Sequence, residues 1–452
     1  MVWNGGGQNR RMLVISLDGF PFALFQKQQS AGIWKQIGAA MPKASSTAMQ
    51  SVIPTVSSVA WSTFMSGRNP GNHRIYGFID RTLPDMSLTL PNASSRRGPS
   101  LQNTLNQHDI PVIMMNVPVT YPPEPINSVL VGGFLGVNPE KIAYPPEVSN
   151  YLAQNGYVID ADTSEAADKP FEFVDQLTDI VRRRCDAFKH LLKSYPWQYA
   201  HLHIMETDRL FHFLWKSVSE FESPLHSRIR HFFEILDSEL FSVINSVNDS
   251  DEIILLSDHG FTESVIEWDI NAWLAETGRL EWLSGDRKGL HRISPDSVAY
   301  SLIPGRIYLN LKGREVTGSV EPDQALKVCA DLIRELASER LPDGINPVFT
   351  DIVHGSNIFS GPYSGAAPDL VAIPAKGVEL KSRMDTGPIK RAPRMQGMHT
   401  FDDAMVVFRH GRFVSKKLKI IDMYSTILSF FGICDKDAEG TVIASWPFSS
   451  GG

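Results

Sequence analysis

The sequence predicts an α/β fold with a doubly wound, mostly parallel central sheet and helices on both faces. Short apolar runs at Met12–Leu17 and Ile253–Leu256 suit strands that are buried on both faces, as in a parallel sheet covered by helices. A carboxylate stands one or two residues beyond each run, at Asp18 and Asp258. Because ligands gather beyond the carboxyl ends of strands in open α/β sheets, we expect a functional site there.

The composition describes a globular chain that can bury a large core. Of 452 residues, 42% are hydrophobic and 21% are charged, and the formal net charge is -7. These values give no reason to expect a nucleic-acid polymer as partner. No stretch approaches the ~20 apolar residues of a membrane span, and the N-terminus lacks the apolar core of a signal peptide. We therefore expect a cytoplasmic protein with no membrane partner. Cys185, Cys329 and Cys434 lack metal-type spacing, which favours buried free thiols.

In the first half of the chain, apolar runs alternate with helical patterns. Small hydroxylated residues around Pro54 lead into a segment with apolar positions that ends at Gly67, so a loop enters a helix near Ser57 or Ser58. Charged residues interleave with apolar ones over Thr178–Leu192, which is typical of an amphipathic helix. The strands expected here are Met12–Leu17, Val112–Met115 and Tyr199–Ile204.

The second half contains a long core helix over Ile229–Ile244 and then the strand at Ile253–Leu256. Beyond Phe261 the alternation loosens, which predicts an inserted lobe over the strand ends at 262–318 and a metal-binding catalytic domain at 10–261 and 319–440. The segment Lys376–Arg394 is rich in Gly, Pro, Lys and Arg and is expected to be a mobile loop. The remaining expected elements are a helix at Pro322–Leu341 and strands at Asp369–Ile373 and Ala404–Phe408.

Several residues with metal-binding or nucleophilic side chains stand near the predicted strand ends. If the chain turns helical at Asp208, the i, i+4 spacing puts Asp208 and His212 on one face, ready to hold one ion. Mixed carboxylate and imidazole ligands suit Zn²⁺ first and Mn²⁺ second, and suit Ca²⁺ or Mg²⁺ less well. The full set, enough for two divalent ions and a nucleophile, is Asp18, Ser57, Asp208, His212, Asp258, His259 and His399.

Two ions would clamp the attacking and leaving oxygens of a phosphoryl transfer, and one ion could lower the pKa of a serine hydroxyl until it attacks as an alkoxide. Such a site needs no general base beside the serine. No G-x-S-x-G elbow surrounds Ser57, so a Ser-His-Asp triad has no support in the sequence.

Five short motifs together resemble the alkaline phosphatase superfamily. Within it, the chain is most similar to the type I phosphodiesterase and nucleotide pyrophosphatase group, including its cytoplasmic phosphohydrolase or phosphomutase members. The resemblance covers residues 12–430 in the family's order, and five motifs in order are specific although each is weak alone. They are L-D-G-F at Leu17–Phe20, P-T-V-S at Pro54–Ser57 with Gly67 ten residues beyond, D-x-x-x-H at Asp208–His212, S-D-H-G-F at Ser257–Phe261 and G-M-H at Gly397–His399.

The resemblance implies a nucleophile and two zinc sites. Characterised nucleotide pyrophosphatases usually have a threonine nucleophile and, three residues on, an asparagine that donates to the phosphate. Here Ser57 and Ala60 occupy these positions, so the phosphate donor is unassigned, and Asn116 or a residue of the lobe is the expected substitute. The implied ligand sets are Asp18, Asp258 and His259 with Ser57 for one ion, and Asp208, His212 and His399 for the other.

Some residues near the motifs have a functional and a structural interpretation. Ser58 and Thr55 are alternative nucleophiles or helix caps. Glu206 either orients a ligand or lies at the surface. Asn116 is a phosphate donor or a turn residue. The basic residues of Lys376–Arg394 belong to a solvated loop or recognise an anionic substrate.

Other residues are set aside as structural. Trp61 and His73 are interpreted as packing residues. His201 and His203 alternate on the presumed strand, and we expect at most one of them to face the site, so neither is included. Asp369 is either a loop carboxylate near the metals or the cap of a strand.

The expected function is two-metal hydrolysis of a small-molecule phosphate ester through a covalent phosphoseryl-type intermediate. A diester is the expected substrate, since no lysine stands in the motif segments next to Ser57, Asp208 and Asp258 to balance the extra charge of a monoester. The alternatives are a phosphomutase or phosphomonoesterase of the same superfamily and a catalytically silent binding protein. The complete ligand set argues against the silent protein.

Overall fold

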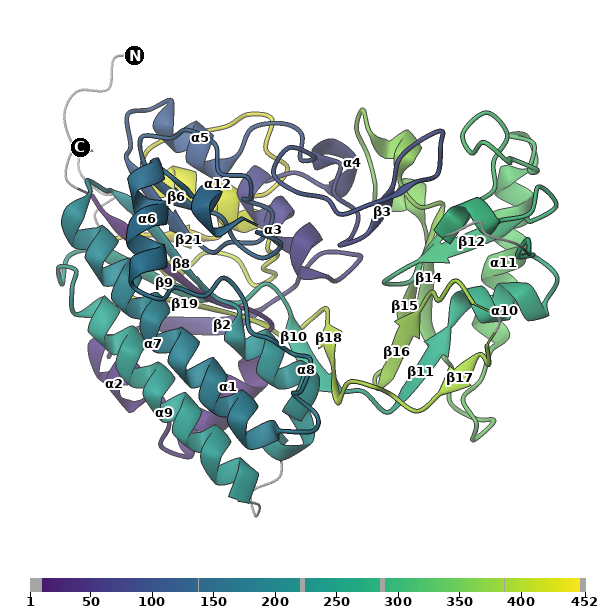
Figure 1. Ribbon diagram of the computed structural model, residues 1–452. Helices are drawn as coiled ribbons and strands as arrows, with labels where there is room; N and C mark the ends of the chain where they lie inside the picture. The colour runs from purple at the N-terminus through teal and green to yellow at the C-terminus, as the bar shows by residue number, and fades with distance from the viewer. Residues whose placement is uncertain (1–9, 137, 220–223, 285–288, 386, 448–452) are drawn as a thin grey trace.

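The apolar run at Met12–Leu17 forms β1, a fully buried strand in the middle of the main sheet. The computed structural model describes residues 10–136, 138–219, 224–284, 289–385 and 387–447 (Figure 1). Its largest sheet has eight strands in the order β2-β19-β9-β1-β8-β5-β6-β7. The other strands of this sheet are β2 (Ser45–Met49), β5 (Val112–Met115), β6 (Ser128–Val131), β7 (Ala143–Tyr144), β8 (Tyr199–Ile204), β9 (Glu252–Leu256) and β19 (Ala404–Phe408).

Five neighbouring strands of this sheet run parallel. β1 lies between β8 and β9, and β5 lies between β8 and β6, all in parallel pairs. β19 and β7 are antiparallel to β9 and β6. The predicted mostly parallel sheet is therefore confirmed. Because Leu17 pairs with Ile204 and Ser16 with Leu256, the carboxyl ends of β8, β1 and β9 lie side by side at one edge.

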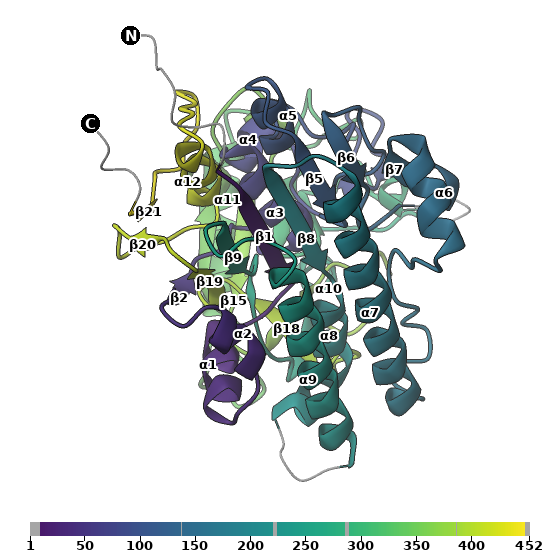
Figure 2. The ribbon, with the colours of Figure 1, turned by 90° about the vertical axis from the view of Figure 1, so that its left-hand side faces the viewer.

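Side chains of β1 alternate between two apolar clusters, one on each face of the sheet. Leu13, Ile15 and Leu17 belong to one cluster, and Met12 and Val14 belong to the other. Figure 2 shows three long helices, α7, α8 and α9, packed along the first face. The helices of the first cluster are α1 (Phe22–Ser30), α2 (Lys35–Ala40), α6 (Pro146–Gln154), α7 (Pro170–Ser194), α8 (Glu206–Ser219) and α9 (Pro224–Ile244). Those of the second are α3 (Ser57–Ser66), α5 (Leu101–Asn106) and α12 (Asp422–Phe430).

Helix α3 begins and ends as the sequence predicts. It starts at Ser57 and is followed by Gly67, whose φ of 62° lies in the left-handed region. A Cβ atom at this position would come within 2.5 Å of the Tyr424 ring. Both the conformation and the close approach require glycine, which fixes the end of the helix that carries the predicted nucleophile.

The chain builds a second, smaller lobe with its own hydrophobic core, on the right of Figure 1. A four-stranded sheet has the order β12-β13-β15-β14, and a three-stranded sheet has the order β16-β11-β17. These strands are β11 (Ile266–Asp269), β12 (Ala299–Leu302), β13 (Arg306–Leu309), β14 (Phe349–His354), β15 (Leu370–Pro374), β16 (Val378–Lys381) and β17 (Lys390–Arg391), with helices α10 (Ile270–Glu276) and α11 (Ala325–Ser338).

This lobe does not coincide with the range 262–318 expected from the sequence. Helix α11 and strands β14 and β15, expected in the catalytic domain, pack in the core of the smaller lobe, because β15 pairs with β13 and β14. The segment expected as a mobile loop, Lys376–Arg394, contains β16 and β17, which flank β11. Residues 285–288 and 386 lie outside the described residues. As a division into domains, we propose that the lobe comprises residues 264–394.

Two strands connect the lobes. β10 (Gly260–Glu263) leads out of the larger lobe, β18 (Gly397–Thr400) leads back, and the two pair antiparallel with Phe261 opposite His399. The segment that follows α3 also reaches the smaller lobe, where Arg81 forms a buried ion pair with Glu315 at 3.2 Å. We call the β10–β18 pair the neck.

The remaining described elements are short. They are α4 (Pro70–His73), β3 (Asp80–Arg81), β4 (Leu88–Thr89), β20 (Arg412–Phe413), β21 (Ala444–Ser445) and the 3₁₀ turns at Pro139–Lys141, Gly289–Arg292, Gly355–Asn357 and Ser364–Ala366.

Two of the three cysteines are as expected. Cys185 and Cys329 are buried free thiols, whereas Cys434 is an exposed free thiol, so that part of the cysteine prediction is wrong.

A buried carboxyl group at the start of β9 makes stability depend on pH. Glu252 accepts hydrogen bonds from the His410 N–H at 3.2 Å and from Trp446 Nε1 at 2.9 Å. Burial nevertheless raises the pKa of Glu252 from 4.5 to about 7. Between these values the folded protein binds a proton that the unfolded chain releases, so this group's contribution to stability falls as pH rises through that window.

Glu252→Gln changes the free energy of unfolding relative to the wild type. We expect this change to be more stabilising at pH 8.5 than at pH 5.5, by about 1 to 3 kcal/mol. The reason is that glutamine removes a buried charge that exists only at the higher pH. Urea unfolding of both proteins at the two pH values measures the difference. The same effect at both values would contradict the raised pKa.

Candidate metal centre and active site

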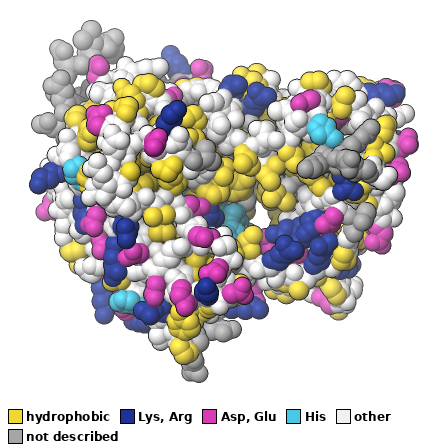
Figure 3. All heavy atoms as spheres, viewed as in Figure 1, with side chains coloured by type: hydrophobic (Ala, Val, Ile, Leu, Met, Phe, Trp, Pro, Cys, Tyr) yellow, Lys and Arg dark blue, Asp and Glu magenta, His cyan; other side chains and the backbone are white. Residues whose placement is uncertain are grey.

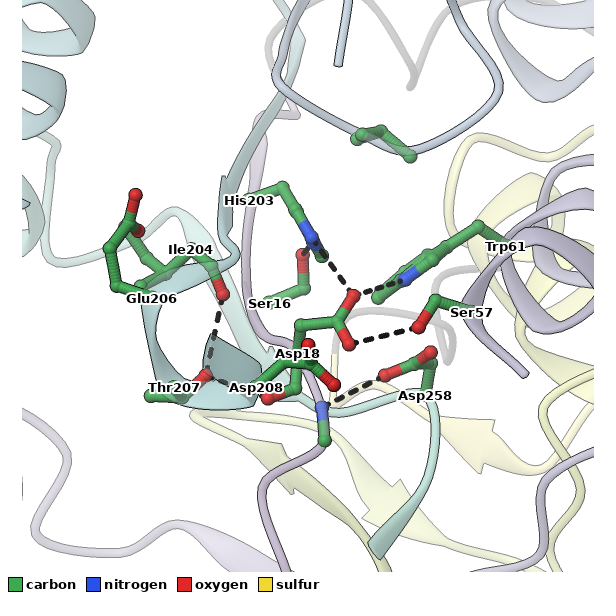
Figure 4. Close-up of polar contacts among 12 residues, drawn as sticks. Ser16, Asp18, Ser57, Trp61, His203, Ile204, Glu206, Thr207, Asp208 and Asp258 are labelled. Atoms are coloured by element: carbon green, nitrogen blue, oxygen red, sulfur yellow. Dashed lines mark hydrogen bonds and ion pairs between the residues drawn. The ribbon is translucent and has the colours of Figure 1, made fainter. Parts of the chain in front are cut away.

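Predicted site residues from three neighbouring strand ends meet at one edge of the main sheet, where Figure 4 shows Asp18, Asp208 and Asp258 together. Asp18 follows β1, Asp258 and His259 follow β9, and Asp208 lies in the first turn of α8, directly after β8. Each of these four side chains is buried. Ser57, the first residue of α3, and His399, in the neck, complete the group from the other side.

The first cluster contains Asp208, His212 and His399. Asp208 Oδ1 lies 3.4 Å from His212 Nε2 and 3.3 Å from His399 Nε2, and the two Nε2 atoms are 3.0 Å apart. The other ring nitrogens face backbone carbonyls, His212 Nδ1 that of Gly397 at 3.1 Å and His399 Nδ1 that of Thr55 at 3.3 Å. A carbonyl only accepts hydrogen bonds, so Nδ1 carries the proton in each neutral ring and Nε2 offers a lone pair.

The first cluster therefore fits a divalent cation. Three lone-pair atoms converge, and Asp208 Oδ1 is buried without a hydrogen-bond donor. This is the predicted i, i+4 pair of α8 joined by a histidine from the neck. Asp208 Oδ2 is occupied instead by the Arg209 guanidinium at 3.1 Å, which leaves Oδ1 for the ion.

The second cluster contains Asp18, Ser57, Asp258 and His259. The Ser57 hydroxyl donates to Asp18 Oδ1 at 3.1 Å and lies 3.2 Å from His259 Nε2. His259 Nε2 is 3.6 Å from Asp18 Oδ1 and 3.4 Å from Asp258 Oδ2. The Gly19 N–H donates to Asp258 Oδ1 at 3.1 Å, and Asp258 Oδ2 is buried without a donor. An uncompensated carboxylate oxygen beside an imidazole nitrogen again fits a cation.

The pKa shifts in the second cluster also fit the binding of a cation. Burial and the nearby charge of Asp18 raise the pKa of Asp258 well above its usual value. Burial and the nearby His399 lower the pKa of His259 to about 3, so its imidazole is neutral and able to bind metal. Burial and the charge of Asp208 would raise the pKa of Asp18, but the nearby His203 and His259 lower it by more, so the net shift is downward. A divalent cation would remove the repulsion between the two carboxylates.

Asp208 borders both clusters. Asp18, Asp208 and His259 each offer one ligand atom, and these three atoms lie within 4.8 Å of one another. The same holds for the ligand atoms of Asp208, His212 and His399. Asp258 is not part of this tighter group, although the sequence places it with Asp18. The two candidate positions therefore adjoin through Asp208.

The site opens on the side of the first cluster. Side chains of Asp18, Asp258 and His259 are 0% exposed, whereas those of His212 and His399 are 16% and 15% exposed. Figure 3 shows a hollow between the two lobes with a histidine side chain in it and Lys and Arg side chains on the smaller lobe beside it. The first cluster therefore lies nearer the protein surface than the second.

Sequence reasoning missed two residues that contact Asp18. Trp61, expected as a packing residue, donates from Nε1 to Asp18 Oδ2 at 3.1 Å. His203 Nε2 lies 3.1 Å from the same oxygen. The premise that His201 and His203 alternate between the faces was wrong, because residues two apart on a strand share a face. Of the two, His203 reaches Asp18, whereas the polar partners of His201 are Ser16 and Tyr199. Both histidines contact Ser16 Oγ at 2.8 Å.

Other candidates have structural partners. Glu206 forms a buried ion pair with Arg184 at 2.6 Å. Asp369 pairs with Arg314 at 2.6 Å within the smaller lobe, and His73 bonds the Thr63 hydroxyl at 3.0 Å. These contacts support structural roles for all three predicted residues.

Asn116 is buried at the end of β5 with φ of 67°. Its Oδ1 accepts from the Tyr157 hydroxyl at 3.3 Å, and its Nδ2 has no hydrogen-bond partner. No hydrogen bond joins the Asn116 side chain to the predicted ligands. Its role as phosphate donor stays a prediction.

The arrangement of a mostly parallel sheet with metal-type ligands at its strand ends is that of the alkaline phosphatase superfamily. The chain matches the family model described as type I phosphodiesterase / nucleotide pyrophosphatase over residues 12–402. It belongs to this family. Membership supports phosphoester hydrolysis as its reaction class and dependence on metal as a property of the family.

Solved structures with the same fold include two members of the superfamily. Phosphonoacetate hydrolase from Sinorhizobium meliloti 1021, in complex with phosphonoformate, has a TM-score of 0.64 and 13% identity, covering 94% of this chain and 95% of its own. An inactive variant of murine ectonucleotide pyrophosphatase/phosphodiesterase 5 in complex with AMP has a TM-score of 0.56 and 13% identity, covering 96% of this chain and 98% of its own. Comparison with curated protein sequences gives no match.

None of the described helices combines the length and the apolar composition that crossing a bilayer requires.

Removing one ligand of the first cluster should empty a metal position. We expect Asp208→Ala or His399→Ala to lower bound Zn²⁺ from about two ions per chain to about one or none, because two side chains hold an ion poorly. Elemental analysis after dialysis against buffered Zn²⁺ measures the content. Asp237→Asn is a matched control, since this buried carboxylate accepts from the N–H groups of Gln36 and Ile37 at 2.9 Å, away from the site. Unchanged metal content in both alanine variants would contradict the assignment.

Proposed function

We propose that this protein is a two-metal phosphodiesterase in which Ser57 is the nucleophile. The observation that carries the proposal is the position of the Ser57 hydroxyl, 3.1 Å from Asp18 Oδ1 and 3.2 Å from His259 Nε2, inside a group of buried metal-type ligands. A serine in this position can bind an ion and attack phosphorus.

The residues present fit two ions, Zn²⁺ first and Mn²⁺ second. Asp208, His212 and His399 would hold one, and Asp18, Asp258 and His259 with Ser57 the other. When bound, the ions supply a lowered pKa for the serine hydroxyl and positive charge beside the phosphate oxygens. We further propose a small-molecule phosphate ester as substrate, in keeping with the AMP and phosphonoformate seen on its structural neighbours, and a cytoplasmic location.

The alternative nucleophiles are less well placed. The Thr55 hydroxyl donates to the Val52 carbonyl at 2.9 Å. The Ser58 hydroxyl is buried without any partner, so it contacts neither Asp18 nor the histidines. Only the Ser57 hydroxyl, of the three, touches the candidate ligands.

Backbone groups of α3 can replace the asparagine that is absent at position 60. The first intrahelical bonds of α3 run from the N–H groups of Val59 and Ala60 to the Val56 carbonyl. The N–H groups of Ser57 and Ser58 precede these bonds and have no intrahelical acceptor, as is usual for a first helical turn. A helix start favours anions, so these groups are suited to a non-bridging phosphate oxygen.

In the proposed reaction, Ser57 Oγ attacks phosphorus, the bond from phosphorus to one ester oxygen breaks, and a seryl phosphodiester forms that keeps the second ester group. The leaving oxygen departs as an alcohol, with the proton lost by the serine hydroxyl reaching it through solvent. Water then cleaves the bond from phosphorus to Ser57, which releases a phosphate monoester and returns the serine. Asp18 orients the hydroxyl as its hydrogen-bond acceptor. Trp61 and His203 hold Asp18 in turn.

The charges around the site favour a diester. A monoester carries more negative charge than a diester and usually needs extra fixed cations. Arg209, the cation beside the first cluster, is held by Asp160 at 2.6 Å and by Asp208. The basic residues of β16 and the segment after it are also paired, Arg383 with Glu267 and with Asp269. Arg209 and Arg383 are therefore already paired with carboxylates.

Substitution of the nucleophile separates catalysis from metal binding. We expect Ser57→Ala to lower kcat by on the order of a thousandfold or more while most metal is retained, and Ser58→Ala to cost far less. Trapping with a slow substrate followed by peptide mass spectrometry should find the phosphoryl group on Ser57. Modification of Thr55 or Ser58 instead would overturn the assignment.

The preferred substrate class can be tested directly. We expect kcat/KM for bis-(p-nitrophenyl) phosphate to exceed that for p-nitrophenyl phosphate under identical metal loading, since Arg209 and Arg383 are already paired with carboxylates. Steady-state kinetics with both esters decide the order. A clear preference for the monoester would favour a phosphatase or phosphomutase, and metal-loaded protein inactive on both would favour a binding protein.

A further inference from the structure

We infer that His203 is a positioning residue for Asp18, an inference that rests on the proposed function. Two side chains approach Asp18 Oδ2, with Trp61 Nε1 and His203 Nε2 each at 3.1 Å. Asp18 Oδ1 accepts from the Ser57 hydroxyl at 3.1 Å and lies 3.6 Å from His259 Nε2 (Figure 4). The two carboxylate oxygens thus have separate partners, one set structural and one set belonging to the reaction.

A line of polar groups behind His203 fixes which of its ring nitrogens carries the proton. Ser16 Oγ lies 2.8 Å from His203 Nδ1 and 2.8 Å from His201 Nε2, and the Tyr199 hydroxyl lies 3.3 Å from His201 Nδ1. The Asp18 carboxylate only accepts, so Nε2 is the ring nitrogen of His203 that carries the proton, and Nδ1 accepts from the Ser16 hydroxyl. Ser16 then accepts from His201, and His201 accepts from Tyr199. The approach of His203 Nε2 to Asp18 Oδ2 at 3.1 Å is an ion-pair contact that falls outside regular hydrogen-bond geometry.

The parallel pairing of β1 and β8 builds this line. Ser16 pairs with His203 and Val14 with His201, and residues two apart on a strand point to the same face. Ser16 and both histidines are 0% exposed. Water is excluded from them and cannot take over the contact to Asp18 if the His203 imidazole is removed.

Helix α3 closes the line from the other side. The Trp61 ring meets the His203 ring edge-on with centroids 4.9 Å apart, and Phe64 meets His201 at 5.5 Å. Trp61 lies one helical turn after Ser57, so the helix that supplies the nucleophile also supplies a donor to Asp18. Packing therefore holds the imidazole of His203 in the orientation that its hydrogen bonds require.

This arrangement restricts how Asp18 can bind an ion. Because Trp61 Nε1 donates to Oδ2 and His203 Nε2 lies beside the same oxygen, Asp18 presents Oδ1 to the metal and to Ser57. A carboxylate without these donors is free to rotate and to offer both oxygens to the ion. Partners that fix a ligand in this way commonly contribute 10- to 100-fold to metal affinity. His203 and Ser16 thus determine the geometry of a position that they do not touch.

The test compares variants that remove or keep the donor. His203→Leu removes it at similar volume, whereas His203→Gln keeps an N–H for Asp18 and a carbonyl for the Ser16 hydroxyl. We expect the Zn²⁺ affinity of the second position, from competition with a chelator, to fall about 10- to 100-fold in His203→Leu and to recover largely in His203→Gln. Ser16→Ala should be intermediate. The visible absorption of the Co²⁺-substituted protein should change in His203→Leu, because Asp18 binds the ion differently.

The control is His73→Leu, which removes a fully buried histidine that bonds Thr63 and not Asp18. It should lower stability yet leave metal affinity and the Co²⁺ spectrum unchanged. Wild-type affinity and spectrum in His203→Leu would overturn the inference. If His203→Leu does not fold, two other results would overturn the inference. One is an unchanged Zn²⁺ affinity in Ser16→Ala. The other is a Zn²⁺ affinity in His203→Gln that is no higher than in a folded His203→Ala variant. Wild-type protein that binds no divalent ion would instead refute the proposed function, and this inference with it.

Discussion

Asp18, Asp208 and Asp258 place three acidic groups in a part of the protein from which water is excluded, where like charges repel strongly. The rest of the architecture follows from accommodating them. The parallel order of β9, β1 and β8 brings their strand ends together, and three imidazoles face them with lone pairs. Other groups meet the remaining carboxylate oxygens. The Gly19 N–H donates to Asp258 and Arg209 donates to Asp208. Trp61 donates to Asp18, and His203 lies beside the same oxygen. The oxygens left without a hydrogen-bond donor, Asp208 Oδ1 and Asp258 Oδ2, are suited to bind cations.

Much of the fold and of the candidate site could be predicted because the relevant signals are local. An apolar run followed by a carboxylate, as at Leu17 and Asp18, specifies both a strand and the edge at which its ligand lies. The rule that ligands gather at the carboxyl ends of parallel strands then assembles residues far apart in sequence without knowledge of their contacts. The positions of Ser57 at a helix start and of Asp208 and His212 on one helix face needed only capping signals and helical spacing.

The parts that sequence reasoning missed depend on pairings between distant segments. The role of His203 follows from the register of β8 on β1, and no local pattern states that register. A signal was nevertheless present, because Ser16, His201 and His203 are polar residues at period two in otherwise apolar strands. The extent of the smaller lobe was missed for a similar reason, since β15 joins β13 across more than 60 residues. The basic residues around Arg383 looked solvated because their acidic partners, Glu267 and Asp269, lie over a hundred positions earlier.

Because the return strand of the neck follows the smaller lobe in the sequence, the first cluster is completed late in synthesis. His399 returns to the larger lobe only after the whole smaller lobe has been made, and it pairs there with Phe261 across the neck. A ribosome-bound chain that ends within the smaller lobe has the other ligands but lacks this one, so it offers only two ligands of the first cluster. Once the chain is complete, an ion held by Asp208, His212 and His399, as proposed above, would act as a reversible cross-link between α8 and the return strand. By mass action, the free metal concentration would then set how firmly that strand is fastened to the larger lobe.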